Sequence, residues 1–208
     1  MSEITLQLET AQPHHSEALI ALQVVAVRNR FKIAQAVADE PIKLFVEQRL
    51  LNSFDEPFSH CVVACVDEHI VGTLCLTWKP KSGEEKARST LFSKAMFHAW
   101  GAWKLLMLAY SVHLIKHEPV AQECYIADLF VLPEYQGQGI ETRLIQWACD
   151  LAKKEANFNL ISVHLNDTDK EIAQFFETFF FRTCLQKGSF VRSLLLGSHR
   201  WNYMALAL

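Results

Sequence analysis

Residues 124–151 constrain the fold more than any other stretch, because they encode a strand, a tight turn and a helix in immediate succession. Residues 125–132 form an apolar run interrupted only by Asp128, which predicts a buried strand. Pro133 ends this run, and Gln136-Gly137-Gln138-Gly139 follow as a glycine-containing turn. Beyond the turn, apolar residues recur at helical spacing: Ile140, Leu144, Ile145, Ala148, Leu151 and Ala152. Such a junction directs free backbone N–H groups and the positive end of a helix dipole toward one point, which suits a phosphate or pyrophosphate.

Of three known glycine-turn signatures, two do not match this turn and one does. It is not a P-loop, because no Gly-Lys-Ser/Thr follows, and it lacks the third glycine of a dinucleotide-binding fingerprint. It resembles motif A of the GNAT superfamily of acetyl-CoA-dependent N-acetyltransferases, V-x-P-x-x-(Q/R)-G-x-G-x-(G/A). The elements that match in register are Val131, Pro133, Gln136, Gly137, Gln138 and Gly139. The last position of the pattern is Glu141 here.

Length and composition predict one domain spanning residues 1–208, because a chain of this size that is 50% hydrophobic can bury a full core. A net charge of -3 gives no electrostatic footprint for nucleic acid. The N-terminus has no basic region followed by an apolar run, so no signal peptide is expected and a cytoplasmic location is predicted. No pair of cysteines has CxxC spacing, which predicts buried thiols in a reducing compartment and neither a zinc site nor a disulfide framework. The cysteines are Cys61, Cys65, Cys75, Cys124, Cys149 and Cys184.

Residues outside the central unit predict alternating strands and helices. Strands are expected at residues 4–10, 60–66, 70–78 and 160–165, the second and third as a hairpin, with closing strands within residues 182–208. Helices are expected at residues 14–26, from Pro41 onward, and from residue 169 onward. The resemblance implies an α/β (α+β) GNAT fold, a mixed and mostly antiparallel central sheet of six to seven strands with flanking helices.

Residues 79–122 do not fit the minimal family pattern and read as an insert. After a charged loop, residues 87–115 look helical, and a wide apolar face predicts packing against the domain itself. The face comprises Met96, Trp100, Trp103, Met107, Tyr110 and Leu114. The polar residues His98, Lys104 and His113 argue against a transmembrane span. A homodimer surface and a peripheral membrane contact remain alternatives, and the insert resembles a Trp/Leu-rich helix found in a subgroup of bacterial GNAT proteins.

The resemblance implies acetyl-CoA as cosubstrate. The family's central strand diverges from its neighbour and its backbone pairs with the pantetheine arm, which by position implies Leu129, Phe130 and Val131. The pyrophosphate would lie over the N–H groups of residues 137–142. The cofactor-binding residues predicted in this way are Leu129, Phe130, Val131, Gln136, Gly137, Gln138, Gly139, Ile140, Glu141 and Thr142. A carboxylate at Glu141 is expected to weaken phosphate binding without abolishing it.

The second family motif, motif B, aligns with residues 169–181 in register but with few identities. Phe176 occupies the position where many members place a tyrosine that acts as general acid, and Phe180 stands where the pattern has glycine. The phenylalanines of this segment are expected to form a core cluster, namely Phe175, Phe176, Phe179, Phe180 and Phe181.

Asp128 is the candidate catalytic base, because an acid among apolar neighbours is expected to have a raised pKa. The competing interpretation of Asp128 is a structural ion pair with a basic residue. Weaker candidates for the base are Glu123, His164 and a water chain. The histidines show no metal-ligand spacing, so no metal is predicted; His117 is interpreted as a surface or helix-end residue.

Two functions of different classes follow. The first is an N-acetyltransferase acting on a primary amine of an unidentified small molecule or protein. The second is a degenerate, non-catalytic GNAT-like domain that acts as a binding or assembly module through the insert helix. Arg28, Arg30 and Lys32 either meet an anionic acceptor or, as the more ordinary interpretation, form a solvated helix end.

Overall fold

The computed structural model describes residues 6–54, 58–79, 94–154, 158–166, 170–188 and 200–208. Its strands form one seven-stranded sheet in the order β1-β2-β3-β4-β5-β7-β6. They are β1 (Leu6–Thr10), β2 (Ser59–Val66), β3 (His69–Trp78), β4 (Glu123–Val131), β5 (Leu160–Asn166), β6 (Arg182–Gly188) and β7 (Arg200–Ala207). Only β4 and β5 pair in parallel, so the mixed, mostly antiparallel sheet expected from the sequence is confirmed.

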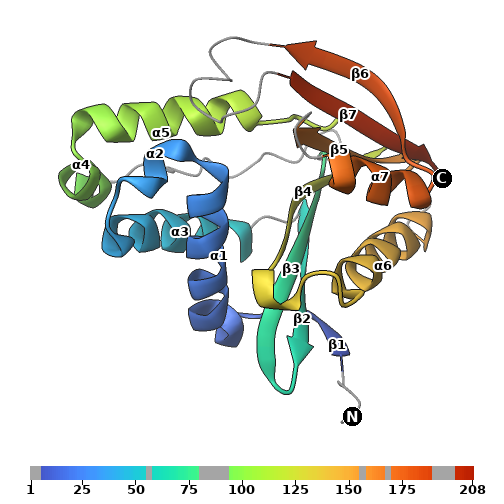
Figure 1. Ribbon diagram of the computed structural model, residues 1–208, viewed down its shortest axis with the longest axis horizontal. Helices are drawn as coiled ribbons and strands as arrows, with labels where there is room; N and C mark the ends of the chain where they lie inside the picture. The colour runs from blue at the N-terminus through green and yellow to red at the C-terminus, as the bar shows by residue number, and fades with distance from the viewer. Residues whose placement is uncertain (1–5, 55–57, 80–93, 155–157, 167–169, 189–199) are drawn as a thin grey trace.

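Helices cover both faces of the sheet, with α1 to α5 on one side and α6 and α7 on the other (Figure 1). The α-helices are α1 (Ser16–Arg30), α2 (Lys32–Gln35), α3 (Asp39–Phe54), α4 (Lys94–Trp100), α5 (Ala102–Ile115), α6 (Ile140–Lys154) and α7 (Lys170–Thr178). Two short 3-10 helices, η1 (Pro13–His15) and η2 (Pro133–Tyr135), precede α1 and α6. Each layer has its own apolar core. One joins the sheet to α6 and α7, and the other joins α1 to α5 around Phe31, Phe45 and Leu108.

The helix expected at residues 14–26 continues one turn further, to Arg30, and the extra turn carries basic residues toward β4. The expected hairpin is present as β2 and β3, joined through Asp67 and Glu68 in left-handed backbone conformations. The expected strand at residues 4–10 is described from Leu6 onward. Of the closing segments, Trp201–Ala207 lies within β7, whereas the apolar run at residues 194–196 lies outside the described residues.

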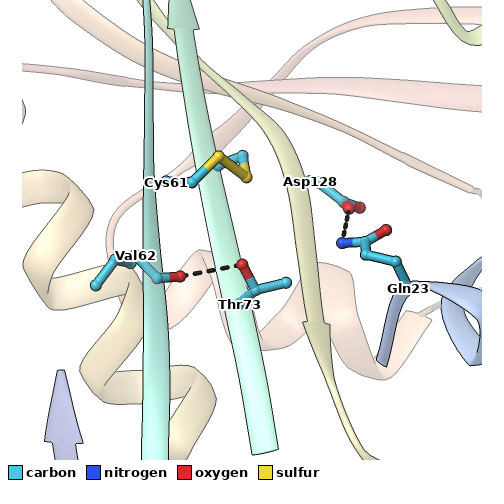
Figure 2. Close-up of a disulfide and its surroundings, with 6 residues drawn as sticks. Gln23, Cys61, Val62, Thr73 and Asp128 are labelled. Atoms are coloured by element: carbon cyan, nitrogen blue, oxygen red, sulfur yellow. Dashed lines mark hydrogen bonds between the residues drawn. A yellow bond between two sulfur atoms is a disulfide. The ribbon is translucent and has the colours of Figure 1, made fainter. Parts of the chain in front are cut away.

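A disulfide joins Cys61 and Cys75, so the prediction of six reduced thiols is wrong for this pair (Figure 2). The two cysteines are direct partners in the β2–β3 register, a proximity that their separation of 14 residues does not reveal. Cys75 is in turn the register partner of Asp128 on β4, so the disulfide and this carboxyl occupy neighbouring strands. The other thiols are reduced: Cys65, Cys124 and Cys149 are buried and Cys184 is exposed.

The insert is not one continuous helix. Gly101, in a left-handed conformation with φ of 74°, separates α4 from α5, and residues 80–93 lie outside the described part of the chain. The break divides the expected apolar face: Met96 and Trp100 are buried against α3, whereas 69% of Trp103 is exposed. α5 also packs on the domain, mainly through Leu105 and Leu108, which the expected face does not include. Within the described residues, no helix is long and apolar enough to cross a membrane.

The expected phenylalanine cluster is correct except at Phe180. Phe176 and Phe181 are buried with their ring centroids 5.1 Å apart, and Phe175 and Phe179 pack on the same core. Phe180 instead follows α7 with φ of 67° and is 79% exposed. A bulky residue is unfavourable in this left-handed region, where glycine adopts the same conformation without steric cost.

Replacing Phe180 with glycine is expected to stabilise the protein by about 1 kcal/mol, because a left-handed conformation costs a non-glycine residue about 1–2 kcal/mol. Urea unfolding measures the change. Phe180→Ala is the matched control, since it removes the exposed ring but keeps Cβ, and it should change stability by less than about 0.5 kcal/mol. Equal stability of the two variants would contradict the assignment of the strain to the backbone.

Candidate active site

The parallel pairing of β4 with β5 covers only Glu123–Ile126 and Leu160–Val163. Beyond these residues the two strands no longer pair, while β4 stays paired with β3 as far as Val131. A cavity of about 760 Å³ opens between the separated segments and is lined by both strands and by the glycine turn. One edge of residues 127–131 therefore faces the cavity without a strand partner, and an extended ligand could pair with its backbone groups.

The glycine turn shapes one end of this cavity. Gly137 and Gly139 adopt φ of 73° and 85°, and no atom lies within 4 Å of a Cβ built on either residue. The turn therefore presents open backbone, and the unpaired N–H groups of the first turn of α6 follow directly. This junction has the geometry of a phosphate site at a helix N-terminus.

Most of the predicted cofactor residues line this cavity, namely Leu129, Phe130, Val131, Gln136, Gly137, Gly139, Glu141 and Thr142. Gln138 and Ile140 do not line it. Gln138 is exposed and its side-chain amide donates to the Glu134 carbonyl at 2.9 Å, whereas the Ile140 side chain is buried in the core. The Gln136 amide donates to the Val131 carbonyl at 3.0 Å and thereby ties the turn to the end of β4.

A second cavity, of about 490 Å³, is lined by residues from α1, α3 and strands β2 to β4. The two cavities share the lining residues Arg30, Ile115, Tyr125, Ala127 and Asp128. Ligands bound in the two cavities would therefore meet beside Tyr125, Ala127 and Asp128 of β4. The Cys61–Cys75 disulfide contributes to the wall of the second cavity.

Asp128 is buried at the boundary between the cavities and both of its oxygens are engaged. Arg30 lies 2.9 Å from Oδ1, and the Gln23 side-chain amide donates to Oδ2 at 2.8 Å (Figure 2). Burial alone would raise the pKa of this carboxyl, but the guanidinium groups of Arg30 and Arg49 and the bond from Gln23 lower it. The expected raised pKa is therefore wrong, and the competing structural ion pair is present.

The basic cluster at the end of α1 has separate roles. Arg28 donates to the carbonyls of Ala34 and Val37 and pairs with Asp39, so it fastens α2 and the start of α3 to α1. Lys32 is exposed and lines neither cavity. Of the cluster, only Arg30 lines both cavities.

A buried carboxylate, Glu123, organises polar side chains beside the cavities. Oε1 accepts hydrogen bonds from the His117 ring at 2.9 Å, from the Tyr203 hydroxyl at 2.8 Å and from the Ser162 hydroxyl. Oε2 accepts the Val120 N–H at 2.7 Å. Burial would raise the pKa of Glu123, but these donors together lower it to about 2.

Sequence reasoning missed His117 and Arg49 as cavity residues. His117 follows α5 and donates Nε2–H to Glu123, which leaves Nδ1 as the ring atom able to accept a proton. The only sequence signal was its position six residues before Glu123, and no periodic pattern marks that spacing. Arg49 appeared to be an ordinary charged residue beside the apolar stripe of α3.

The strand divergence, the open glycine turn and the two cavities have the shape that an extended, phosphate-bearing ligand requires. Residues 27–180 match the model of the acetyltransferase (GNAT) family. The chain therefore belongs to the GNAT family of acetyltransferases.

Solved structures with a similar fold share little sequence with the chain. A GCN5-related N-acetyltransferase from Kribbella flavida superposes with a TM-score of 0.62 at 15% identity, over 98% of each chain. The PaiA N-acetyltransferase from Thermoplasma acidophilum, solved with coenzyme A, gives 0.59 at 13% identity over 99% of this chain and 100% of that one. RimL, a ribosomal L7/L12 alpha-N-protein acetyltransferase also solved with coenzyme A, gives 0.62 at 13% identity over 100% and 97%. The search of curated proteins found no significant match.

Glu123→Gln is expected to lower the free energy of unfolding at pH 7 by about 3 kcal/mol, since a pKa near 2 lies well below the unfolded value of about 4.3. A depressed folded-state pKa contributes stability above the unfolded pKa and loses it as pH falls toward the folded one. The difference between native protein and variant should therefore shrink between about pH 5 and pH 2. Urea unfolding across this range tests the expectation, with the exposed Glu177→Gln as control. A difference that does not depend on pH would contradict it.

Proposed function

We propose that the chain is an N-acetyltransferase that moves an acetyl group from acetyl-CoA to a primary amine of a small molecule or protein. The observation that carries the proposal is the cavity at the divergence of β4 and β5, which continues into the open glycine turn of α6. A strand edge, a phosphate site and a second cavity beside them suit a long thioester substrate and a separate acceptor. The coenzyme A complexes of PaiA and RimL support the assignment.

The residues that would hold acetyl-CoA are those of the diverging segment and the turn. The backbone of Leu129 to Val131 would pair with the pantetheine arm, and the N–H groups of residues 137–142 would receive the pyrophosphate, with Thr142 adding a hydroxyl. When bound, acetyl-CoA supplies an activated acetyl thioester. Glu141 is half-buried and lines this cavity, so its charge opposes the phosphates and is expected to weaken binding.

The amine acceptor would enter the second cavity and reach the boundary at Tyr125 and Asp128. Attack requires a neutral amine, so one group must take its proton, and the departing thiolate must receive one. We assign the first role to His117, because Glu123 fixes its ring and leaves Nδ1 available beside this cavity. Tyr125 would serve as the acid, because a phenol is protonated at neutral pH and this residue lines both cavities. Phe176 offers no proton.

Asp128 is still proposed to assist catalysis, but by positioning Arg30 and not by accepting a proton. A carboxylate whose pKa is lowered accepts a proton poorly at neutral pH. Its charge would instead hold Arg30 at the boundary between the two cavities. The predicted cytoplasmic location and homodimer belong to this proposal too, and neither affects the chemistry.

The alternative is a binding or assembly module that no longer catalyses. Glu141 in the cofactor cavity and phenylalanine at position 176 favour it. So does the exposed apolar surface on α4 and α5, formed by Phe97, Trp103, Leu106 and Tyr110. The two functions differ in one requirement, because only the enzyme must bind acetyl-CoA.

Glu141→Gln is expected to tighten acetyl-CoA binding by roughly tenfold or more, because it removes a negative charge from the phosphate site. Isothermal titration calorimetry of the native protein and the variant measures the effect, with the exposed Glu17→Gln on α1 as a control of equal charge. Binding by the native protein supports the enzyme. If neither protein binds acetyl-CoA, the proposed function fails and the binding module is favoured.

His117→Gln is expected to lower kcat by about 10²-fold or more with any amine acceptor found by screening. Asp128→Asn should lower kcat less, because Asp128 holds Arg30 and takes no proton in the proposed reaction. The release of coenzyme A by each variant separates the two roles. A larger loss of kcat in Asp128→Asn than in His117→Gln would assign the base to Asp128.

A further inference from the structure

Among the residues that the structure describes, Arg49 has no anionic partner within ion-pair distance. Its side chain lies on α3 and lines the second cavity together with Arg30 and Asp128. Its guanidinium carbon is 5.9 Å from the centre of the Phe45 ring, a cation–π contact one helical turn away. Within the described residues, no carboxylate lies within ion-pair distance of Arg49 and no hydrogen bond reaches it.

The other charges around this cavity are already matched. Asp128 gives one oxygen to Arg30 at 2.9 Å and the other to Gln23 at 2.8 Å. Lys116 pairs with Glu118 at 2.8 Å, and His117 donates to Glu123. Asp128 therefore faces two guanidinium groups while directly contacting one of them. Among the described residues that line this cavity, one positive charge is therefore left without an ion-pair partner, and it belongs to Arg49.

These surroundings are unfavourable for the charged guanidinium of Arg49 unless a bound anion is present. Burial lowers the pKa of Arg49, Asp128 opposes this effect from a distance, and the like charge of Arg30 adds to it. A largely desolvated guanidinium that has no acceptor among the described residues would gain hydrogen bonds from an anionic ligand in the cavity. A planar fork of donors facing a cavity is the ordinary means by which proteins bind a carboxylate or a phosphate.

We infer that Arg49 is the anion-binding residue of the acceptor cavity, and that the acceptor is an amine that also carries a carboxylate or phosphate group. The inference rests on the proposed function, which places the acceptor in this cavity. Arg49 would bind the anionic group while the amine passes His117 and reaches Asp128 at the boundary between the cavities. Arg30, held by Asp128, adds positive potential without itself being free to bind. The acceptor is thereby fixed at both ends, which orients the amine for attack.

The test is direct binding of small probes, which needs neither acetyl-CoA nor turnover. N-acetylglycine carries a carboxylate, N-acetylglycinamide is its neutral counterpart, and inorganic phosphate represents the second anion. Side-chain Nε–H signals of ¹⁵N-arginine-labelled protein follow each titration. N-acetylglycine or phosphate should shift the Arg49 signal, and the amide should not. Whichever of the two anions binds more tightly identifies the group that the acceptor carries.

Arg49→Gln should weaken binding of the anion by roughly tenfold or more, since the charged pair is lost. Arg49→Lys keeps the charge but loses the fork, so an intermediate loss is expected. Arg182→Gln removes an exposed arginine on β6 and should leave binding unchanged. Thermal unfolding of each variant checks that it is folded. Equal affinities for the amide and the two anions, or an Arg49 signal that no anion moves, would overturn the inference.

A second arm separates this inference from the proposed function. With acetyl-CoA present, the amines glycine and O-phosphoethanolamine are compared with glycinamide and ethanolamine for release of coenzyme A. Acetylation of all four at similar kcat/KM would leave the enzyme intact and overturn the anion site. If calorimetry shows that acetyl-CoA does not bind, the proposed function fails, and anion binding by Arg49 is still decided by the probe titrations.

Discussion

Everything in the site depends on the short parallel pairing between β4 and β5. Because the pairing ends at Ile126, the remaining residues of β4 keep a partner on the β3 side only. Pairing with β3 continues to Val131 despite a register shift beside Ala127, while the opposite edge faces the larger cavity. The glycine turn and α6 follow directly, so the phosphate-binding junction has a fixed position relative to that edge. The divergence of β4 from β5 thus produces the cavity and aligns its strand edge with the phosphate-binding junction.

The buried carboxylate of Glu123 holds the closed end of this divergence together. Glu123 lies on β4 and bonds to Ser162 on β5 and Tyr203 on β7, so one anion links three strands. A buried charge is costly unless several donors surround it, and here four donors do so. The same bonds orient His117 toward the acceptor cavity. One interaction therefore fixes where the strands separate and places the ring that we assign as base.

Sequence reasoning succeeded where the determinants are local and failed where they depend on register. The strand, glycine turn and helix of residues 124–151 follow from neighbouring residues, and so does the β2–β3 hairpin. The Cys61–Cys75 disulfide depends on which residues face each other across two strands. The excess charge of Arg49 depends on three elements meeting at one cavity, α1, α3 and β4. Gly101 could have signalled a helix break, but the apolar face on both sides of it outweighed that signal.

The two carboxylates near the reacting groups show why the base is best sought elsewhere. Both Asp128 and Glu123 have lowered pKa values, the first through neighbouring guanidinium groups and the second through four hydrogen-bond donors. A group stabilised in its charged form gives up that stabilisation when it accepts a proton, so each additional donor makes it a weaker base. The hydrogen bond to Glu123 fixes the His117 ring and leaves Nδ1 as the nitrogen that can accept a proton. The environment that disqualifies Glu123 as a base is therefore the one that positions His117.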